Sequence, residues 1–209
     1  MIFRNICCFA FLISALVFAN RITIAETYDL EPVYIDTVGY YAPLDLYPVN
    51  VAADNNLVYI LDLFHEEVRA RRFDGTPVWS FPYSEQWPRD IEVDTDGNIY
   101  IADANGDSNV KKYSPTGELL LTIGEKGLLP GQFDRPLAFI LDDSGNIYVA
   151  DRGTELSKFD SNGNLIWNNI NSVIPDADLS RPNGIAIDSD GNIYVADSDR
   201  VEIIVFDSN

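Results

Sequence analysis

Acidic side chains gather around a glycine near the end of the chain, in the stretch DSDGNIYVADSDR from Asp188 to Arg200. An EF-hand-type calcium loop needs oxygen ligands at positions 1, 3, 5, 7, 9 and 12 and a glycine at position 6. Counted from Asp188, Gly191 falls at position 4, and Ile193 and Val195 occupy positions 6 and 8. A tight turn explains the same residues, with Asp188 accepting backbone N–H groups and Gly191 at positive φ. We therefore predict a turn between two strands, and weak binding of a divalent cation stays open as the alternative.

Arginine side chains form a second candidate site. Arg89, Arg135 and Arg181 each stand beside a proline, at equivalent places in three sections of the chain. Guanidinium groups bind carboxylates and phosphates in a bidentate manner, so three of them on one rim can collect an anionic ligand. Trp87 and Phe133 lie next to two of the arginines as candidate contact aromatics. The alternative is that the arginines brace neighbouring aspartates of the turns.

These candidate residues recur because the sequence repeats. DTDGNIYIADANG from Asp94, DDSGNIYVADRGT from Asp142 and the divergent ADNNLVYILDLFH from Ala53 are related to the opening stretch. The tyrosines of the four copies follow one another at steps of 41, 48 and 46 residues: Tyr59, Tyr100, Tyr148 and Tyr194. A preceding proline recurs in step with them: Pro48, Pro88, Pro136 and Pro182. A period in the forties built from short strands indicates repeated small sheets.

Each repeat predicts four antiparallel strands. In the third, we expect strands at Leu137–Leu141, Asn146–Ala150, Thr154–Phe159 and Asn164–Trp167, separated by turns rich in Gly and Asn. The second strand lacks polar alternation, which is typical of a strand buried on both faces. We therefore predict an all-β fold, a β-propeller with four blades present. The predicted units cover approximately residues 48–81, 88–124, 136–168 and 182–209.

The repeats resemble the NHL repeat family of β-propellers. The stretches that carry the resemblance are RPNGIAIDSDGNIYVADS from Arg181 and GQFDRPLAFILDDSGNIYVAD from Gly131, and related residues extend from about Pro48 to Asn209. The first unit departs most, with Asn56 where the others have glycine; since asparagine tolerates a left-handed backbone, we expect its turn to survive.

The resemblance also bears on how the blades close. Propellers of the NHL family commonly have six blades, so we expect an incomplete propeller of the six-bladed type. Residues 33–39 (VYIDTVG) are similar to the fourth strand LLLTIG at Leu119, and we predict a closing-type strand there. The fourth unit is expected to have three strands. A small closed ring of four blades is the alternative.

Two enzymatic interpretations compete with binding. His65 is the only histidine, which excludes a zinc site built from several histidines. Gluconolactonase-like propellers hold a divalent cation at the central channel, and Asn183 resembles their Asn-Gly position. Arg89 and Leu137 stand at the equivalent positions of other units, and Asp90 lies one residue away. We therefore expect a non-enzymatic binding or scaffold module without a cofactor, and a metal-dependent hydrolase or lyase is the alternative.

Composition and the first residues indicate location and exclude some partners. The chain carries 33 acidic and 14 basic side chains, and such a surface repels nucleic acid. Arg4 precedes an apolar run from Ile6 to Ala19, typical of a signal peptide and short for a membrane span. We predict a signal peptide at residues 1–25 and an extracytoplasmic protein at 26–209, without a stable membrane span after cleavage. Its ligand is a protein or small molecule of unknown identity.

Overall fold

A computed structural model describes residues 47–83, 87–152, 156–169 and 179–207. These residues form antiparallel β-sheets, and no helix occurs among them, so this part of the chain has no helix that could cross a membrane. The predicted all-β class is confirmed. The predicted signal peptide and the closing-type strand at 33–39 lie outside the described residues.

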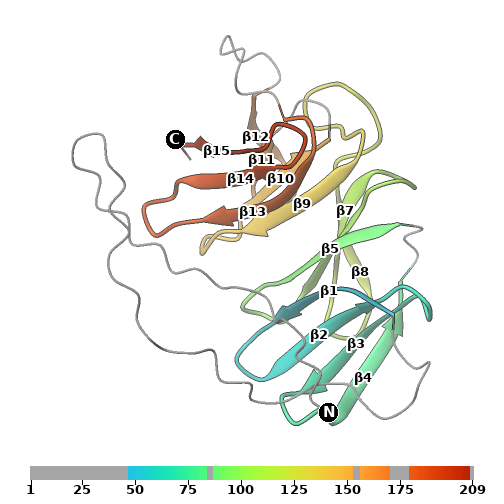
Figure 1. Cartoon of the computed structure of the whole chain (residues 1–209). Helices are drawn as coiled ribbons and strands as arrows, with labels where there is room; N and C mark the ends of the chain where they lie inside the picture. Colours follow the sequence, from blue (N-terminus) through green and yellow to red (C-terminus); the bar gives the residue numbers. More distant parts are fainter. Residues whose placement is uncertain (1–46, 84–86, 153–155, 170–178, 208–209) are drawn as a thin grey trace, which may run out of the picture. The chain divides into compact units, whose positions relative to one another are not determined.

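Four sheets follow one another along the chain, each with its strands in sequence order (Figure 1). The first three sheets have four strands, and the fourth has three within the described residues. The first sheet contains β1 (Pro48–Ala53), β2 (Leu57–Asp62), β3 (Glu67–Arg72) and β4 (Pro77–Pro82), and the second contains β5 (Pro88–Val93), β6 (Ile99–Asp103), β7 (Asn109–Tyr113) and β8 (Leu119–Ile123). The third contains β9 (Pro136–Leu141), β10 (Ile147–Asp151), β11 (Leu156–Phe159) and β12 (Leu165–Asn168), and the fourth contains β13 (Pro182–Ile187), β14 (Ile193–Asp197) and β15 (Glu202–Phe206).

The acidic stretch is a turn, as predicted. Asp188 Oδ1 accepts the N–H groups of Asp190 and Asn192 at 2.9 and 2.8 Å. Gly191 has a φ of 87° and donates its N–H to the Asp188 carbonyl. Asp188 Oδ2 also accepts the hydroxyl of Tyr194 at 3.0 Å, and the same contact recurs at the same spacing of six residues in the second and third sheets. The carboxylate of Asp188 is therefore engaged by its own turn.

The first sheet forms its turn differently from the prediction. The Asp54 N–H bonds to the Leu57 carbonyl, three residues on, whereas Asp94 bonds to Asn98, four residues on. The first turn is thus one residue shorter, and Asn56 is not among the residues with positive φ. The turn survives, as predicted, but Asn56 does not take the left-handed conformation of glycine, because the shorter loop has no position that requires it.

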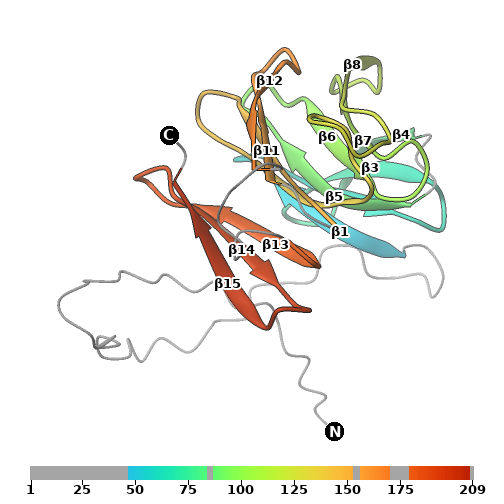
Figure 2. The same cartoon turned by 90° about the horizontal axis from the view of Figure 1, so that it is seen from above.

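Neighbouring sheets pack face to face. Tyr59 and Leu61 of β2 pack with Ile99 and Ile101 of β6, and the same pattern joins the second sheet to the third. The third sheet presents Tyr148 and Ala150 to Ile193 and Val195 of the fourth. Figure 2 shows β13, β14 and β15 as a sheet of their own beside the third. One blade therefore covers its neighbour with branched aliphatic side chains.

The first strand of each sheet lies on the inside of this arrangement. Contacts run from β1 to β5, from β5 to β9 and from β9 to β13. Within the described residues the four sheets do not close into a ring (Figure 1). The four inner strands therefore line a common space, called here the axial pocket.

Candidate functional site

Four arginines from three sheets converge on one pocket of about 410 Å³. This pocket, called here the arginine pocket, is lined by Trp87, Arg89, Ala104, Asn105, Arg135, Leu137, Arg152 and Arg181. Arg89 lies at the start of β5, Arg135 and Arg181 directly precede β9 and β13, and Arg152 directly follows β10. The arginine-rich rim predicted from the sequence therefore exists as a concave surface.

Buried aspartates fix the backbone on which these arginines stand. Asp151, the last residue of β10, accepts the N–H groups of Asp134 and Arg135 at 2.9 and 2.6 Å. Asp197 holds Ser180 and Arg181 in the same way in the fourth sheet. Burial alone would raise the pKa of Asp197, but these N–H donors lower it below its ordinary value. The carboxylate of Asp197 therefore stays ionised at neutral pH, and both aspartates order the entry to the next strand.

Among the described residues, the guanidinium groups of these arginines are largely unpaired. Within the described residues, Arg89, Arg135 and Arg152 have no carboxylate within 4.0 Å, and Arg181 Nη1 reaches Asp199 Oδ1 only at 4.0 Å. Asp151 and Asp197 accept the backbone N–H groups of Arg135 and Arg181. The alternative in which the arginine side chains brace these aspartates therefore does not explain where the guanidinium groups lie. The pocket thus concentrates positive charge in a chain whose formal net charge is −19.

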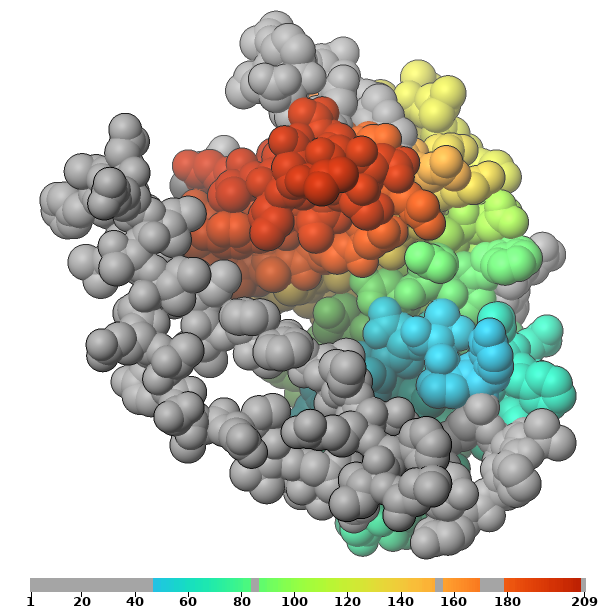
Figure 3. Space-filling view, in the orientation of Figure 1, coloured from blue at the N-terminus to red at the C-terminus, as the bar shows by residue number. Residues whose placement is uncertain are grey.

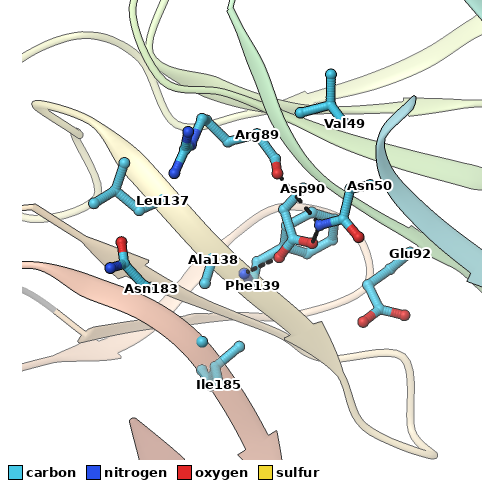
Figure 4. Close-up of a pocket in the computed structure, with 11 residues that line it drawn as sticks. Val49, Asn50, Arg89, Asp90, Glu92, Leu137, Ala138, Phe139, Asn183 and Ile185 are labelled. Carbon is cyan, nitrogen blue, oxygen red and sulfur yellow. Dashed lines mark hydrogen bonds between the residues drawn. The ribbon is translucent and has the colours of Figure 1, made fainter. Parts of the chain in front are cut away.

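The axial pocket lies beside the arginine pocket and has the opposite character. It measures about 380 Å³ and is lined by Val49, Asn50, Arg89, Asp90, Glu92, Leu137, Ala138, Phe139, Asn183, Gly184 and Ile185 (Figure 4). Arg89 and Leu137 line both pockets. In Figure 4 the Arg89 guanidinium lies toward Leu137, whereas Glu92 lies on the far side of Asp90. The two pockets therefore form one polar surface with a cationic and an anionic part.

Asp90 joins three sheets. Its Oδ1 accepts Asn50 Nδ2 at 2.7 Å from the first sheet, and its Oδ2 accepts the Phe139 N–H at 2.8 Å from the third. The Ile91 N–H is a further donor at 3.0 Å. Burial raises the pKa of Asp90 to about 6, although these donors and nearby Arg89 act in the opposite direction. The carboxylate is thus fully engaged in the structure.

Glu92 lies two residues further along β5 and has no such partners. Within the described residues no hydrogen bond or ion pair reaches its carboxylate. Burial, followed by the charge of Asp90, raises the pKa of Glu92 to about 7. The side chain is half-buried and lines the axial pocket. Glu92 is therefore the acidic group there that is available to a ligand.

The structure separates the residues that the sequence grouped together. Trp87, Arg89, Arg135 and Arg181 line the arginine pocket, whereas Asn183 lines the axial pocket and donates from Nδ2 to Ser198 Oγ at 2.8 Å. Phe133 is fully buried and packs against Phe159, so it is a core residue and lines neither pocket. Sequence reasoning placed it beside Arg135 because the two are close in the chain, but their side chains point to different regions.

Several lining residues were missed. Arg152 follows β10, whereas the predicted arginines precede the first strands, so the pattern of arginine beside proline did not include it. Asn50 and Glu92 lie within inner strands and become visible only once those strands are brought together. The signal that could have identified Asn50 and Glu92 is a polar residue within an inner strand, seen when the first strands of the repeats are compared.

His65 and the aspartates of the turns are engaged by neighbouring protein groups in the described part of the chain. His65 Nδ1 lies 2.8 Å from Asp62 Oδ2, and Asp62 also contacts Arg69 Nε at 3.2 Å. No group of three or more His, Cys, Asp or Glu side chains that could hold a metal ion occurs among the described residues. His65 thus belongs to the polar network that anchors the end of β2.

Sheets of antiparallel strands, packed face to face in chain order along a shared inner space, define a repeat protein of the β-propeller type. A family model described as NHL repeat matches residues 179–206, and the predicted resemblance is confirmed. NHL repeat-containing protein 3 of Homo sapiens is 36% identical over 88 residues, and that of Mus musculus is 38% identical over 76 residues. These matches cover 39% and 35% of this chain but only 25% and 22% of the relatives.

Solved structures support the fold. A protein of unknown function from Bacteroides caccae matches with a TM-score of 0.57 and 20% identity, covering 80% of this chain and 59% of that chain. Streptogramin B lyase matches with a TM-score of 0.58 and 14% identity, covering 77% of this chain and 54% of that chain. At these identities the likeness concerns the fold alone.

Proposed function

We propose that this protein is an extracytoplasmic, non-enzymatic binding module that takes up an anionic ligand in the arginine pocket. The observation that carries the proposal is the convergence of Arg89, Arg135, Arg152 and Arg181 on one concavity. The extracytoplasmic location rests on the apolar run from Ile6 to Ala19 behind Arg4.

Electrostatics favours a ligand at this place. Like charges held together repel one another, so a cluster of guanidinium groups is costly unless an anion offsets it. Guanidinium groups suit carboxylate and phosphate because their N–H donors match two oxygens at once. Trp87, 55% exposed at the same pocket, adds a rigid contact surface for the apolar part of a ligand.

Isothermal titration calorimetry with citrate at low ionic strength tests the proposal. Each charge-assisted hydrogen bond is worth about 1.5–3 kcal/mol, so the double variant Arg135→Ala, Arg152→Ala should weaken citrate binding at least about tenfold. Arg72→Ala, an exposed arginine outside both pockets, is the matched control and should leave the affinity within about twofold. Absence of citrate binding by the unmodified protein, or equal losses in both variants, would refute the arginine pocket as a site for carboxylates.

A metal-dependent hydrolase or lyase of the gluconolactonase-like propeller type is the second candidate. The oxygen atoms of Asn50, Asp90, Glu92 and Asn183 at the axial pocket favour it, since they come from three different sheets. Lactone hydrolysis that requires calcium or zinc and disappears in Asn183→Ala would support this candidate over the binding module.

A further inference from the structure

The adjoining pockets carry opposite charges within the reach of one small ligand. Arg89 and Glu92 are three residues apart on β5, which corresponds to about 10 Å along a strand. We propose that the axial pocket receives an ammonium group of the same ligand whose anionic groups bind the arginine pocket, so that the ligand is zwitterionic. This inference rests on the proposed function and adds the chemical class of the ligand.

Glu92 is the residue that we assign to the ammonium group. The carboxylate of Asp90 already accepts three donors, from Asn50, Ile91 and Phe139. Glu92 accepts none within the described residues, although it is half-buried. A partly desolvated carboxylate without donors is unfavourable, and an ammonium group supplies both the opposite charge and up to three N–H donors.

The opposite side of the axial pocket offers a second acceptor. Asn183 donates its Nδ2 to Ser198 Oγ, and this hydrogen bond fixes the orientation of the amide. Its Oδ1 accepts no hydrogen bond within the described residues, and Asn183 lines the same pocket as Glu92. Asn183 Oδ1 is therefore a further acceptor on the wall of this pocket.

An organic ammonium group fits this pocket better than a metal ion does. Calcium takes six to eight oxygen ligands, and zinc sites use three or four N, S or O ligands. Here one of the two carboxylates is occupied by three protein donors, and the described residues hold no group of three metal-ligating side chains. An ammonium group brings its own hydrogen-bond donors to the carboxylate of Glu92, so it needs fewer protein ligands than a metal ion does.

A pair of peptides that differ in one charged group tests the inference. The probes are N-acetyl-Lys-Glu-Glu and N-acetyl-norleucine-Glu-Glu, in which a hydrogen atom replaces the ammonium group of the side chain and all carboxylates are kept. Calorimetry at pH 8 and low salt keeps both Glu92 and the lysine charged. We expect the lysine peptide to bind at least about tenfold more tightly.

Variants assign each part of the binding to its pocket. Glu92→Gln should abolish the preference for the lysine peptide, whereas Arg152→Ala should weaken both peptides by similar factors. Arg72→Ala is the matched control that leaves both affinities unchanged.

Each other outcome has a definite meaning. Equal binding of both peptides that still depends on Arg152 would overturn the zwitterionic ligand and leave the proposed function standing. Failure of both peptides to bind would refute both proposals. A lysine preference that survives in Glu92→Gln would show that the axial pocket does not bind ammonium as proposed.

Discussion

Two carboxylates on one strand have different roles because their surroundings differ. Asp90 is held by donors from the first, second and third sheets, so it connects the inner strands. Glu92 has the same chemistry and a similar position, but no donor within the described residues. Hydrogen bonds therefore offset part of the cost of burying the carboxylate of Asp90, whereas none within the described residues offsets the partial burial of Glu92.

The raised pKa of Glu92 predicts how stability varies with pH. Its ordinary value of 4.5 applies to the unfolded chain, and about 7 applies to the folded one, so the folded state binds the proton more tightly between these values. The stabilising contribution is complete below pH 4.5 and is lost as the pH rises through 7. Glu92→Gln should therefore raise the melting temperature at pH 8 and flatten its decline between about pH 4.5 and 7.

Thermal unfolding followed by circular dichroism across this pH range measures the effect. Glu118→Gln, which removes an exposed carboxylate beside β8, is the control and should keep the decline of the unmodified protein. Parallel curves for Glu92→Gln and the unmodified protein would mean that Glu92 keeps its ordinary pKa in the folded state.

At the scale of single residues, the sequence predicted those candidate site residues that recur at equivalent positions of the repeats. Arg89, Arg135 and Arg181 were found because equivalent positions of a repeat lie on one face. Arg152 belongs to one repeat only, and Phe133 was assigned to the surface because nothing in the local sequence shows that it packs against Phe159. Contacts between residues distant in the chain decide both cases.

Among the elements, the hairpin turns were the most predictable. The third sheet was expected to begin at Leu137 and begins at Pro136, because aspartate, glycine and asparagine mark both ends of the hairpins. The hydroxyl of each repeat tyrosine binds the aspartate of its own turn, as in Tyr148 with Asp142 at 3.2 Å. That contact could not be predicted, because it requires the side chain to fold back along the strand.

Two turn glycines with similar φ values differ in how closely a neighbouring sheet packs against them. Gly97 and Gly117 have φ values of 79° and 83°. A Cβ at Gly97 would lie 3.5 Å from Pro115, an ordinary contact, whereas at Gly117 it would lie 2.6 Å from the Cβ of Phe81 in the first sheet. The turn before β8 is thus pressed against its neighbour.

Alanine substitutions at these glycines should therefore differ in cost. Gly97→Ala introduces only backbone strain, of the order of 1 kcal/mol, whereas Gly117→Ala adds overpacking of about 1–3 kcal/mol against Phe81. Urea unfolding of both variants measures the difference. Equal losses of stability would indicate that the two sheets separate at this point without cost.

For the whole molecule, the decisive feature is a face of the fourth sheet that no other sheet covers within the described residues. Tyr100 and Tyr148 are each 1% exposed because the next sheet packs on them, whereas Tyr194, their equivalent in β14, is 37% exposed. Ile203 and Val205 on β15 share this face and are 67% and 55% exposed. Figure 3 shows the side chains of the fourth sheet open at the surface. Contiguous apolar surface of this kind promotes association.

Closure of the propeller could not be predicted from the repeat alone. A period of 41 to 48 residues suits rings of different blade number, since it fixes the size of one sheet and leaves the angle between sheets undefined. The packing of Tyr148 and Ala150 against Ile193 and Val195 shows what kind of surface covers such a face, namely branched aliphatic side chains. The corresponding face of the fourth sheet is therefore suited to a surface of the same kind.

A single lysine should suppress association through this face. In the second and third sheets, Lys112 and Lys158 pair across the strands with Tyr100 and Tyr148 and lie 4.9 and 5.0 Å above their rings. Val205 occupies the same place opposite Tyr194. Val205→Lys thus installs a residue that the fold already accepts there, so the variant should keep its melting temperature within a few degrees.

Multi-angle light scattering over a range of concentrations measures the consequence. The unmodified protein should gain mass with concentration, because burying its apolar face is favourable at roughly 25 cal/mol per Å². Val205→Lys should remain closer to the mass of one chain, since association would have to desolvate the new charge. Leu128→Lys, an equal change of charge at an exposed loop residue, should associate like the unmodified protein. If the unmodified protein is a monodisperse monomer at every concentration, burial of this apolar face does not drive self-association, and the prediction for Val205→Lys is wrong.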